Sequence, residues 1–108
     1  MLVGALLNLH ADDTVYTKVD VKPIPIRTPP PEYPKQLKRE GVSGVVAVSI
    51  VIDETGAVIG SSVVKSTNPD FNDATLDAVK KWKFKPALID GKPVKMRVTL
   101  PIKFSLDD

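Results

Sequence analysis

The chain has 108 residues, with 15 lysines and arginines against 13 acids, so its formal net charge is only +2. This length fits a single domain, and the small charge argues against nucleic-acid binding, since most nucleic-acid binders of this size are far more basic. There is no cysteine and one histidine, His10, so the sequence offers neither a disulfide nor a cysteine-based zinc site.

Residues 1–11 form a mostly apolar start. Their apolar run, LVGALLNL, is far shorter than the ~20 residues that span a bilayer. It resembles the apolar part of an export signal, with LHA before Asp12 as a cleavage site, although no basic residue precedes it. The interpretations left open are a remnant of a signal or anchor, a disordered start, and a short element packed on the domain.

Residues 12–31 are expected to be extended. The stretch TVYTKVDV alternates as a strand does, with valine or threonine at every second position. The following KPIPIRTPPPEYP holds six of the ten prolines, which favours polyproline II over helix interior or central strand. We therefore predict a strand and a stiff connector ahead of a domain at residues 32–108.

The domain opens with a predicted helix and a predicted hairpin. In YPKQLKREG, Pro34 suits a helix start and Gly41 suits its end. The stretches GVVAVSIVID and AVIGSSVVKS are predicted strands, joined by the turn residues DETG. Gly60 in the second strand is a candidate for a bulge. The residues of the first strand predicted to share the core face are Val46, Val48, Ile50 and Ile52.

A second helix is predicted in NPDFNDATLDAVKKWKF. Aromatic residues among lysines are a common sign of nucleic-acid binding. Helical spacing, however, places Trp82 inward with the apolar stripe, where it cannot stack on bases. Lys80 and Lys81 face solvent, and Asp77 can pair with Lys81 at i, i+4. A core helix that ends in charge is therefore favoured.

The last predicted strand covers residues 94–106, where every even position is apolar. Pro101 lacks an N–H, so the strand should lie at a sheet edge, at least locally. The whole order predicts an α+β fold, α-β-β-α-β: a small antiparallel sheet of three main strands with two helices on one face, plus a possible extra N-terminal strand.

No catalytic, cofactor or metal site is expected. The only histidine lies outside the domain, so no serine–histidine–acid triad can form. The acids fall in turns or at the C-terminus without the spacing of a paired-carboxylate site, and the six glycines are too scattered for a phosphate loop.

Several segments, taken in order, resemble the TonB C-terminal domain family between residues 30 and 106. They are PEYPKQLKREGVSGVVAVSIVIDETGAV, DATLDAVKKWKFKPA, GKPV and VTLPIKFSL. The resemblance implies a periplasmic domain of Gram-negative bacteria that transduces energy to outer-membrane receptors for siderophores and cobalamin. It implies two partners: the receptor's TonB box, a short peptide that pairs as an added strand, and an inner-membrane proton-driven complex.

The sequence departs from the family pattern because it shows neither a full transmembrane helix nor a long Pro-Glu or Pro-Lys spacer. Two expectations follow: a fragment of a transducer, or a stand-alone periplasmic interaction or assembly module, for instance a peptidoglycan-associated one. The second would have no role in transport.

The last strand is the predicted peptide site, since an edge strand carries unpaired N–H and C=O groups. Pairing should be strongest over residues 97–100, and the basic face should prefer acidic or carbonyl-rich peptides. The alternative is that residues 15–21 cover this edge, within one chain or in a strand-exchanged homodimer. The candidate partner-binding residues are Lys95, Arg97, Val98, Thr99, Leu100 and Lys103, with Tyr33 and Pro34 as a neighbouring wall.

Overall fold

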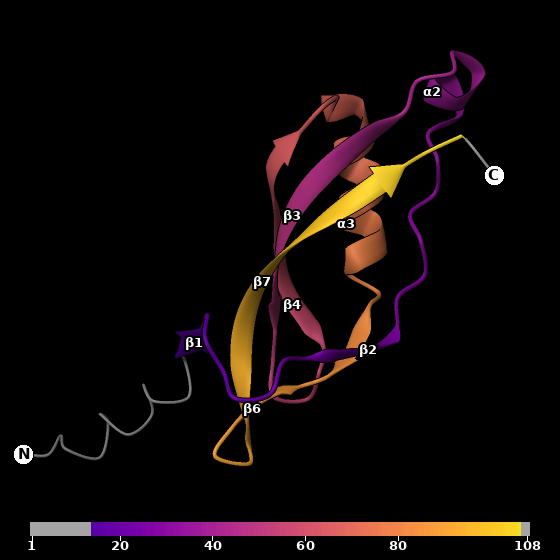
Figure 1. Cartoon of the computed structure of the whole chain (residues 1–108). Helices are drawn as coiled ribbons and strands as arrows, with labels where there is room; N and C mark the ends of the chain where they lie inside the picture. Colours follow the sequence, from indigo (N-terminus) through magenta and orange to yellow (C-terminus); the bar gives the residue numbers. More distant parts are fainter. Residues whose placement is uncertain (1–13, 107–108) are drawn as a thin grey trace, which may run out of the picture.

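The computed structural model describes residues 14–106, so the apolar start at 1–11 lies outside the described residues. A twisted sheet forms the body of the molecule, with one long helix against it (Figure 1). The predicted order α-β-β-α-β is present as α2, β3, β4, α3 and β7. In chain order the elements are β1 (Val15–Tyr16), β2 (Ile24–Arg27), α2 (Lys35–Arg39), β3 (Gly44–Ile52), β4 (Val58–Ser66), the 3-10 helix η2 (Pro69–Phe71), α3 (Asn72–Val79), β5 (Lys83–Lys85), β6 (Ala87–Ile89) and β7 (Lys92–Phe104).

Strand β3 is the centre of the sheet and pairs antiparallel with β4 on one side and β7 on the other. Its register with β7 runs without a shift from Gly44 opposite Phe104 to Ile52 opposite Met96. The register with β4 shifts twice, once directly beside Gly60. This confirms the bulge expected there, which lets the hairpin twist strongly.

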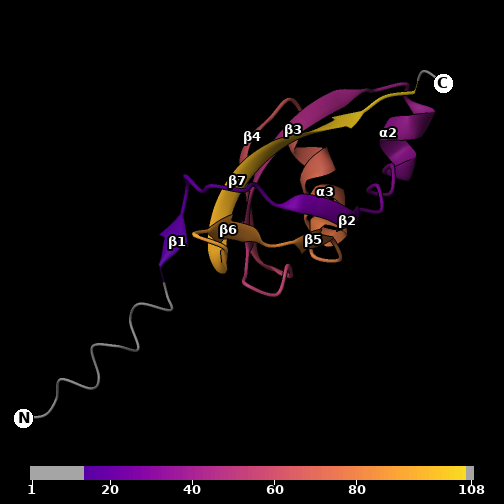
Figure 2. The same ribbon diagram turned by 60° about the horizontal axis from the view of Figure 1, so that its bottom comes forward.

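The N-terminal part differs from the prediction. The strand expected over residues 15–21 is wrong in length, because only β1 pairs with β7; β1 runs parallel to β7. The proline-rich segment, expected to be an unpaired connector, contains β2, which lies beside β5 in a separate two-stranded sheet (Figure 2). Proline is tolerated at the edge of such a ribbon, where its missing N–H faces solvent.

The helices are also placed differently in detail. Helix α3 covers the sheet, whereas α2 lies at one end of it (Figures 1 and 2). Helix α3 ends at Val79, earlier than predicted, because i→i+3 bonds from Lys81 N to Ala78 O and from Trp82 N to Val79 O tighten the last turn. The predicted pair of Asp77 with Lys81 is replaced by Asp77 with Lys80 at 3.5 Å.

The core consists of two adjoining clusters between the sheet and the helices. Trp82 is only 8% exposed, so the prediction that it faces inward is confirmed. All four residues predicted on the inner face of β3 are fully buried. Within residues 14–106 no helix is long and apolar enough to cross a membrane. The first cluster contains Val48, Ile50, Ile52, Val79, Trp82 and Phe84, and the second contains Leu37, Val46, Phe71 and Phe104.

Candidate functional site: the open edge of the last strand

One side of β7 lacks a complete neighbour. On the side away from β3, β1 pairs with Lys95 and Met96; β6 pairs with residues 92–94, beyond the end of the pairing with β3. In the part of the chain that the structure describes, no strand pairs with this side of β7 over residues 97–104. We call residues 97–104 the open edge. The prediction that the last strand lies locally at an edge is confirmed.

The position of Pro101 indicates which backbone groups the open edge presents. Pro101 lies opposite Ala47, and the register passes through this pair without a shift. A proline fits such a ladder when its nitrogen points away from the paired strand. Alternate residues of an antiparallel strand direct their backbone groups to the same side. Arg97, Thr99 and Lys103 therefore direct their N–H groups outward with Pro101, which supplies only a carbonyl there. The pairing of Tyr16 with Met96 in the parallel β1–β7 ladder takes up the N–H of Arg97, so the open donors are those of Thr99 and Lys103.

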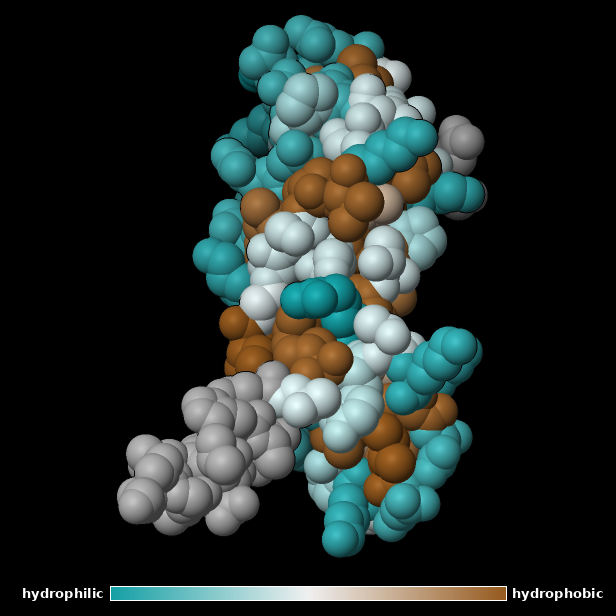
Figure 3. Space-filling model, turned by 90° about the vertical axis from the view of Figure 1, so that its left-hand side faces the viewer, coloured by the Kyte–Doolittle hydropathy of each residue, from teal (hydrophilic) through white to brown (hydrophobic). Residues whose placement is uncertain are grey.

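The side chains of the open edge divide between two faces. Val98, Leu100 and Ile102 are half-buried against the first core cluster, while the side chains between them are exposed on the face away from α3. Seen from that side, apolar and polar side chains are intermixed (Figure 3). Within residues 14–106, no ion pair joins Arg97 or Lys103 to an acid, so both carry uncompensated positive charge.

A groove of about 670 Å³ lies along the open edge on its inner face. One wall is β7 over residues 96–102, and the floor is Ile52, Trp82 and Phe84. We call this cavity the edge groove. Its opposite wall comes from the N-terminal segment, through Thr17, Lys22, Pro23, Pro25 and Thr28.

Residues 15–29 cross the molecule and are fixed at intervals; we call them the strap. Strand β1 pairs with β7, and β2 pairs with β5. Between them, Val21 N donates to Leu88 O at 3.1 Å and Leu88 N donates to Val21 O at 3.0 Å. At the far end, Trp82 Nε1 donates to Pro29 O at 2.8 Å. The strap thus pairs with β7 only at Lys95 and Met96. Elsewhere it forms the opposite wall of the edge groove.

Tyr33 is held in the second core cluster. Its hydroxyl donates to Val42 O, and its ring lies edge-on to Phe71 and Phe104, with centroid distances of 5.7 and 5.6 Å. Tyr33 therefore reaches β7 only at the end of the strand. The structure does not bring it into the edge groove with residues 97–100.

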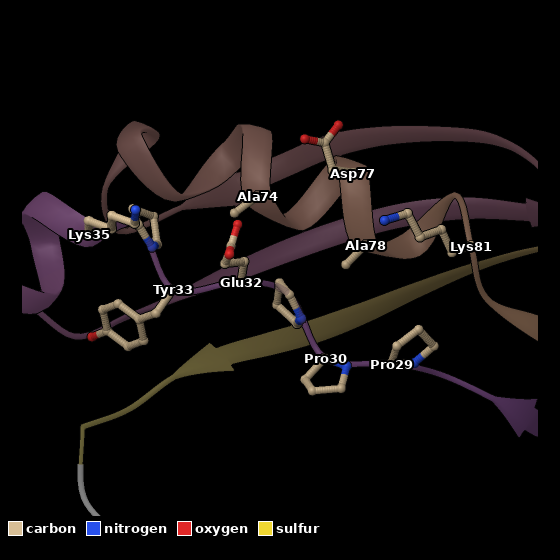
Figure 4. Close-up of a pocket in the computed structure, with 11 residues that line it drawn as sticks. Pro29, Pro30, Glu32, Tyr33, Lys35, Ala74, Asp77, Ala78 and Lys81 are labelled. Atoms are coloured by element: carbon tan, nitrogen blue, oxygen red, sulfur yellow. The ribbon is translucent and has the colours of Figure 1, made fainter.

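Pro34 precedes α2 and shares with Tyr33 a second cavity, of about 720 Å³, between the proline-rich segment and α3 (Figure 4). Ala74 and Ala78 give this cavity an apolar helix side. Its lining contains two acids and two lysines, so it offers no concentrated field of one sign. The charged residues are Glu32, Lys35, Asp77 and Lys81.

Among the described residues, no three side chains of histidine, cysteine, aspartate or glutamate are grouped so that they could hold a metal ion. The one carboxyl with a resolved pKa shift, Asp53, lies in the turn between β3 and β4. Burial opposes its ionisation, but hydrogen bonds from the side chain of Thr55 and the backbone of Ala57 and Thr55 outweigh that effect, so the pKa of Asp53 lies below its ordinary value of 3.8. The positive charge of Lys83 adds to this lowering. These contacts order a turn and lie outside the edge groove.

Comparison with known proteins gives one consistent result. The sequence pattern of the family described as "Gram-negative bacterial TonB protein C-terminal" matches residues 29–106. Protein TonB of Vibrio cholerae is 36% identical over 78 residues, which are 71% of this chain and 32% of that protein. Protein TonB of Xanthomonas campestris pv. campestris is 39% identical over 79 residues, 72% of this chain and 35% of that protein. The match thus spans about a third of the length of these curated relatives.

Two solved structures share the fold. The solution NMR structure of the Pseudomonas aeruginosa TonB C-terminal domain superposes with a TM-score of 0.69 at 29% identity, covering 82% of this chain and 91% of that one. The TonB2 protein of Vibrio anguillarum gives a TM-score of 0.60 at 28% identity, covering 88% and 92%. Both matches extend over most of the sheet and helices described above.

Proposed function

This chain belongs to the family of Gram-negative bacterial TonB protein C-terminal domains, and we propose that it binds the TonB box of an outer-membrane receptor in the periplasm. The peptide adds to the open edge as a further strand. The observation that carries the proposal is the unpaired side of β7 over residues 97–104.

Strand addition is the binding mode that this edge supports best. An edge strand presents a row of N–H and C=O groups, and an extended peptide satisfies them with main-chain hydrogen bonds. Each such bond contributes a net of about 0.5–1.5 kcal/mol. The outward N–H of Thr99 lies in the section where pairing should be strongest, since Pro101 contributes no donor beyond it.

Charge supports an acidic or carbonyl-rich peptide. Arg97 and Lys103 on the exposed face of β7, with Lys22 on the strap, place positive charge on both faces of the open edge. Complementary charge speeds association and fixes register more than it adds affinity. Association should therefore slow as salt rises.

A titration with peptides methylated on backbone nitrogen tests the proposal. The whole chain would be titrated calorimetrically with a TonB-box peptide and with versions N-methylated at each position in turn. A methyl group blocks one donor, and alternate donors of an added strand face away from β7. We expect affinity to fall at every second position only. Failure of the unmethylated peptide to bind would contradict the proposal, as would equal losses at all positions.

The proposal extends to energy coupling: the chain is part of a transducer that draws on an inner-membrane proton-driven complex to open receptors. A strain that lacks the gene should lose uptake of siderophores or cobalamin through its outer-membrane receptors. Normal uptake in such a strain, together with peptide binding by the isolated chain, would contradict the coupling and leave an interaction module without a transport role.

A further inference from the structure

We infer that the edge groove reads the side-chain pattern of the bound peptide, selecting apolar residues at alternate positions and acidic residues between them. The inference rests on the proposed strand addition at the open edge. The floor of the edge groove and the strap then determine which peptides bind.

An added strand would place half of its side chains in the edge groove. Neighbouring strands lie about 4.8 Å apart, and successive side chains point to opposite faces. Inward side chains of the peptide would lie beside Val98 and Leu100 and above Trp82 and Phe84. Val98 and Leu100 are apolar and only half-buried, so apolar side chains of the peptide would remove further apolar surface from water.

The other half of the peptide's side chains would lie on the opposite face. There Arg97, Thr99 and Lys103 are exposed. Directly opposed charges on neighbouring strands attract, whereas like charges repel. Acidic residues are therefore favoured at the outward positions, and lysine or arginine is disfavoured.

The strap supplies the wall that makes the inward positions selective. Pro23 and Pro25 line the groove with rings, and proline has no N–H that would need a partner on binding. The pairing of β2 with β5 and the bond from Trp82 Nε1 to Pro29 O, 2.8 Å long, hold this wall in place. A fixed wall limits the size of the inward side chains, so the strap is a determinant of specificity.

Two peptides of identical composition separate this inference from the proposed function. Both are acetylated and amidated heptapeptides: EVDLDVE alternates apolar and acidic residues, and EDDEVLV places them in two blocks. A TonB-box peptide is measured beside them by calorimetry on the whole chain. We expect the alternating peptide to bind at least about tenfold more tightly than the blocked one.

Equal affinities of the two heptapeptides, or no binding of either, would overturn the inference while a bound TonB-box peptide leaves strand addition intact. Failure of all three peptides would instead contradict the proposed function itself. The inference and the proposed function can therefore be refuted independently of each other.

A substitution in the strap tests the wall directly. Thr28 is exposed and lines the edge groove, so Thr28→Trp should fill the groove without disturbing the core. The matched control is Ser62→Trp at an exposed position of β4 outside the groove. Thr28→Trp should reduce the preference for the alternating peptide to less than about threefold, and Ser62→Trp should leave it unchanged. An unchanged preference in Thr28→Trp would overturn the role of the strap.

Discussion

The indole Nε1 of Trp82 donates a hydrogen bond of 2.8 Å to the carbonyl oxygen of Pro29, 53 residues earlier in the chain. Trp82 is at the same time a member of the first core cluster and part of the floor of the edge groove. One side chain thus packs the core, shapes the proposed peptide site and fixes the far end of the strap.

Two substitutions at Trp82 should separate these roles. Trp82→Ala should lower the free energy of unfolding by about 3–5 kcal/mol, because a large buried aromatic leaves a cavity. Trp82→Phe keeps most of the packing but removes the donor, so its cost should be smaller and amide exchange in β2 should speed up. Chemical denaturation and hydrogen exchange measure the two effects. A loss under about 1 kcal/mol for Trp82→Ala, or unchanged exchange of β2 in Trp82→Phe, would contradict this account.

Two glycines with positive φ offer a matched comparison of strain. Gly41 follows α2 at φ +71°, and a Cβ there would have no neighbour within 4 Å, whereas a Cβ on Gly56 at φ +89° would lie 1.7 Å from Phe84 O. Gly41→Ala should cost only the left-handed backbone, about 1–2 kcal/mol. Gly56→Ala must also push β5 away and should cost clearly more. Equal denaturation midpoints for the two variants would show that the turn at Gly56 yields freely.

Asp53 should make stability depend on pH at the acid end. Its carboxylate accepts from Thr55 N at 2.9 Å, Thr55 Oγ1 at 2.7 Å and Ala57 N at 3.0 Å. Because the pKa of Asp53 is lowered in the folded chain, the ionised group stabilises the fold above its ordinary value of 3.8, and this contribution is lost as pH falls through the folded-state pKa.

Asp53→Ala should therefore destabilise the chain at pH 7 by about 1–2 kcal/mol, with the difference from the unsubstituted chain shrinking as the pH drops below 3.8. Urea denaturation over a pH series measures it, with Glu54→Ala as the neighbouring control. A difference that stays constant down to the acid end would show that the charge of Asp53 is not responsible.

The alternation of apolar residues and the positions of turn-forming residues are sufficient to predict the centre of the fold. The alternation of β3 places Val46, Val48, Ile50 and Ile52 correctly in the core. Gly41, predicted to end the first helix, has φ +71° just after α2. These features depend on residues close in sequence, where local sterics and burial on one face decide the conformation.

The strap cannot be predicted in the same way. The pairing of β2 with β5, and the hydrogen bond that Pro29 O accepts from Trp82 Nε1, join segments more than 50 residues apart. No local pattern specifies such partners, and the prolines by themselves favour an unpaired segment. The open edge is predictable because Pro101 is a local signal, but the groove beside it needs the strap and has no such signal.

Strand addition requires that the outward amides of the open edge are unpaired until a peptide binds. Hydrogen exchange of single backbone amides, followed by NMR in the whole chain with and without a TonB-box peptide, measures this. We predict that the Thr99 and Lys103 amides exchange quickly alone and become protected on binding, while Val98 and Leu100 are protected throughout by β3. Thr99 and Lys103 amides that are already protected in the unbound chain, or that gain no protection with saturating peptide, would contradict this prediction.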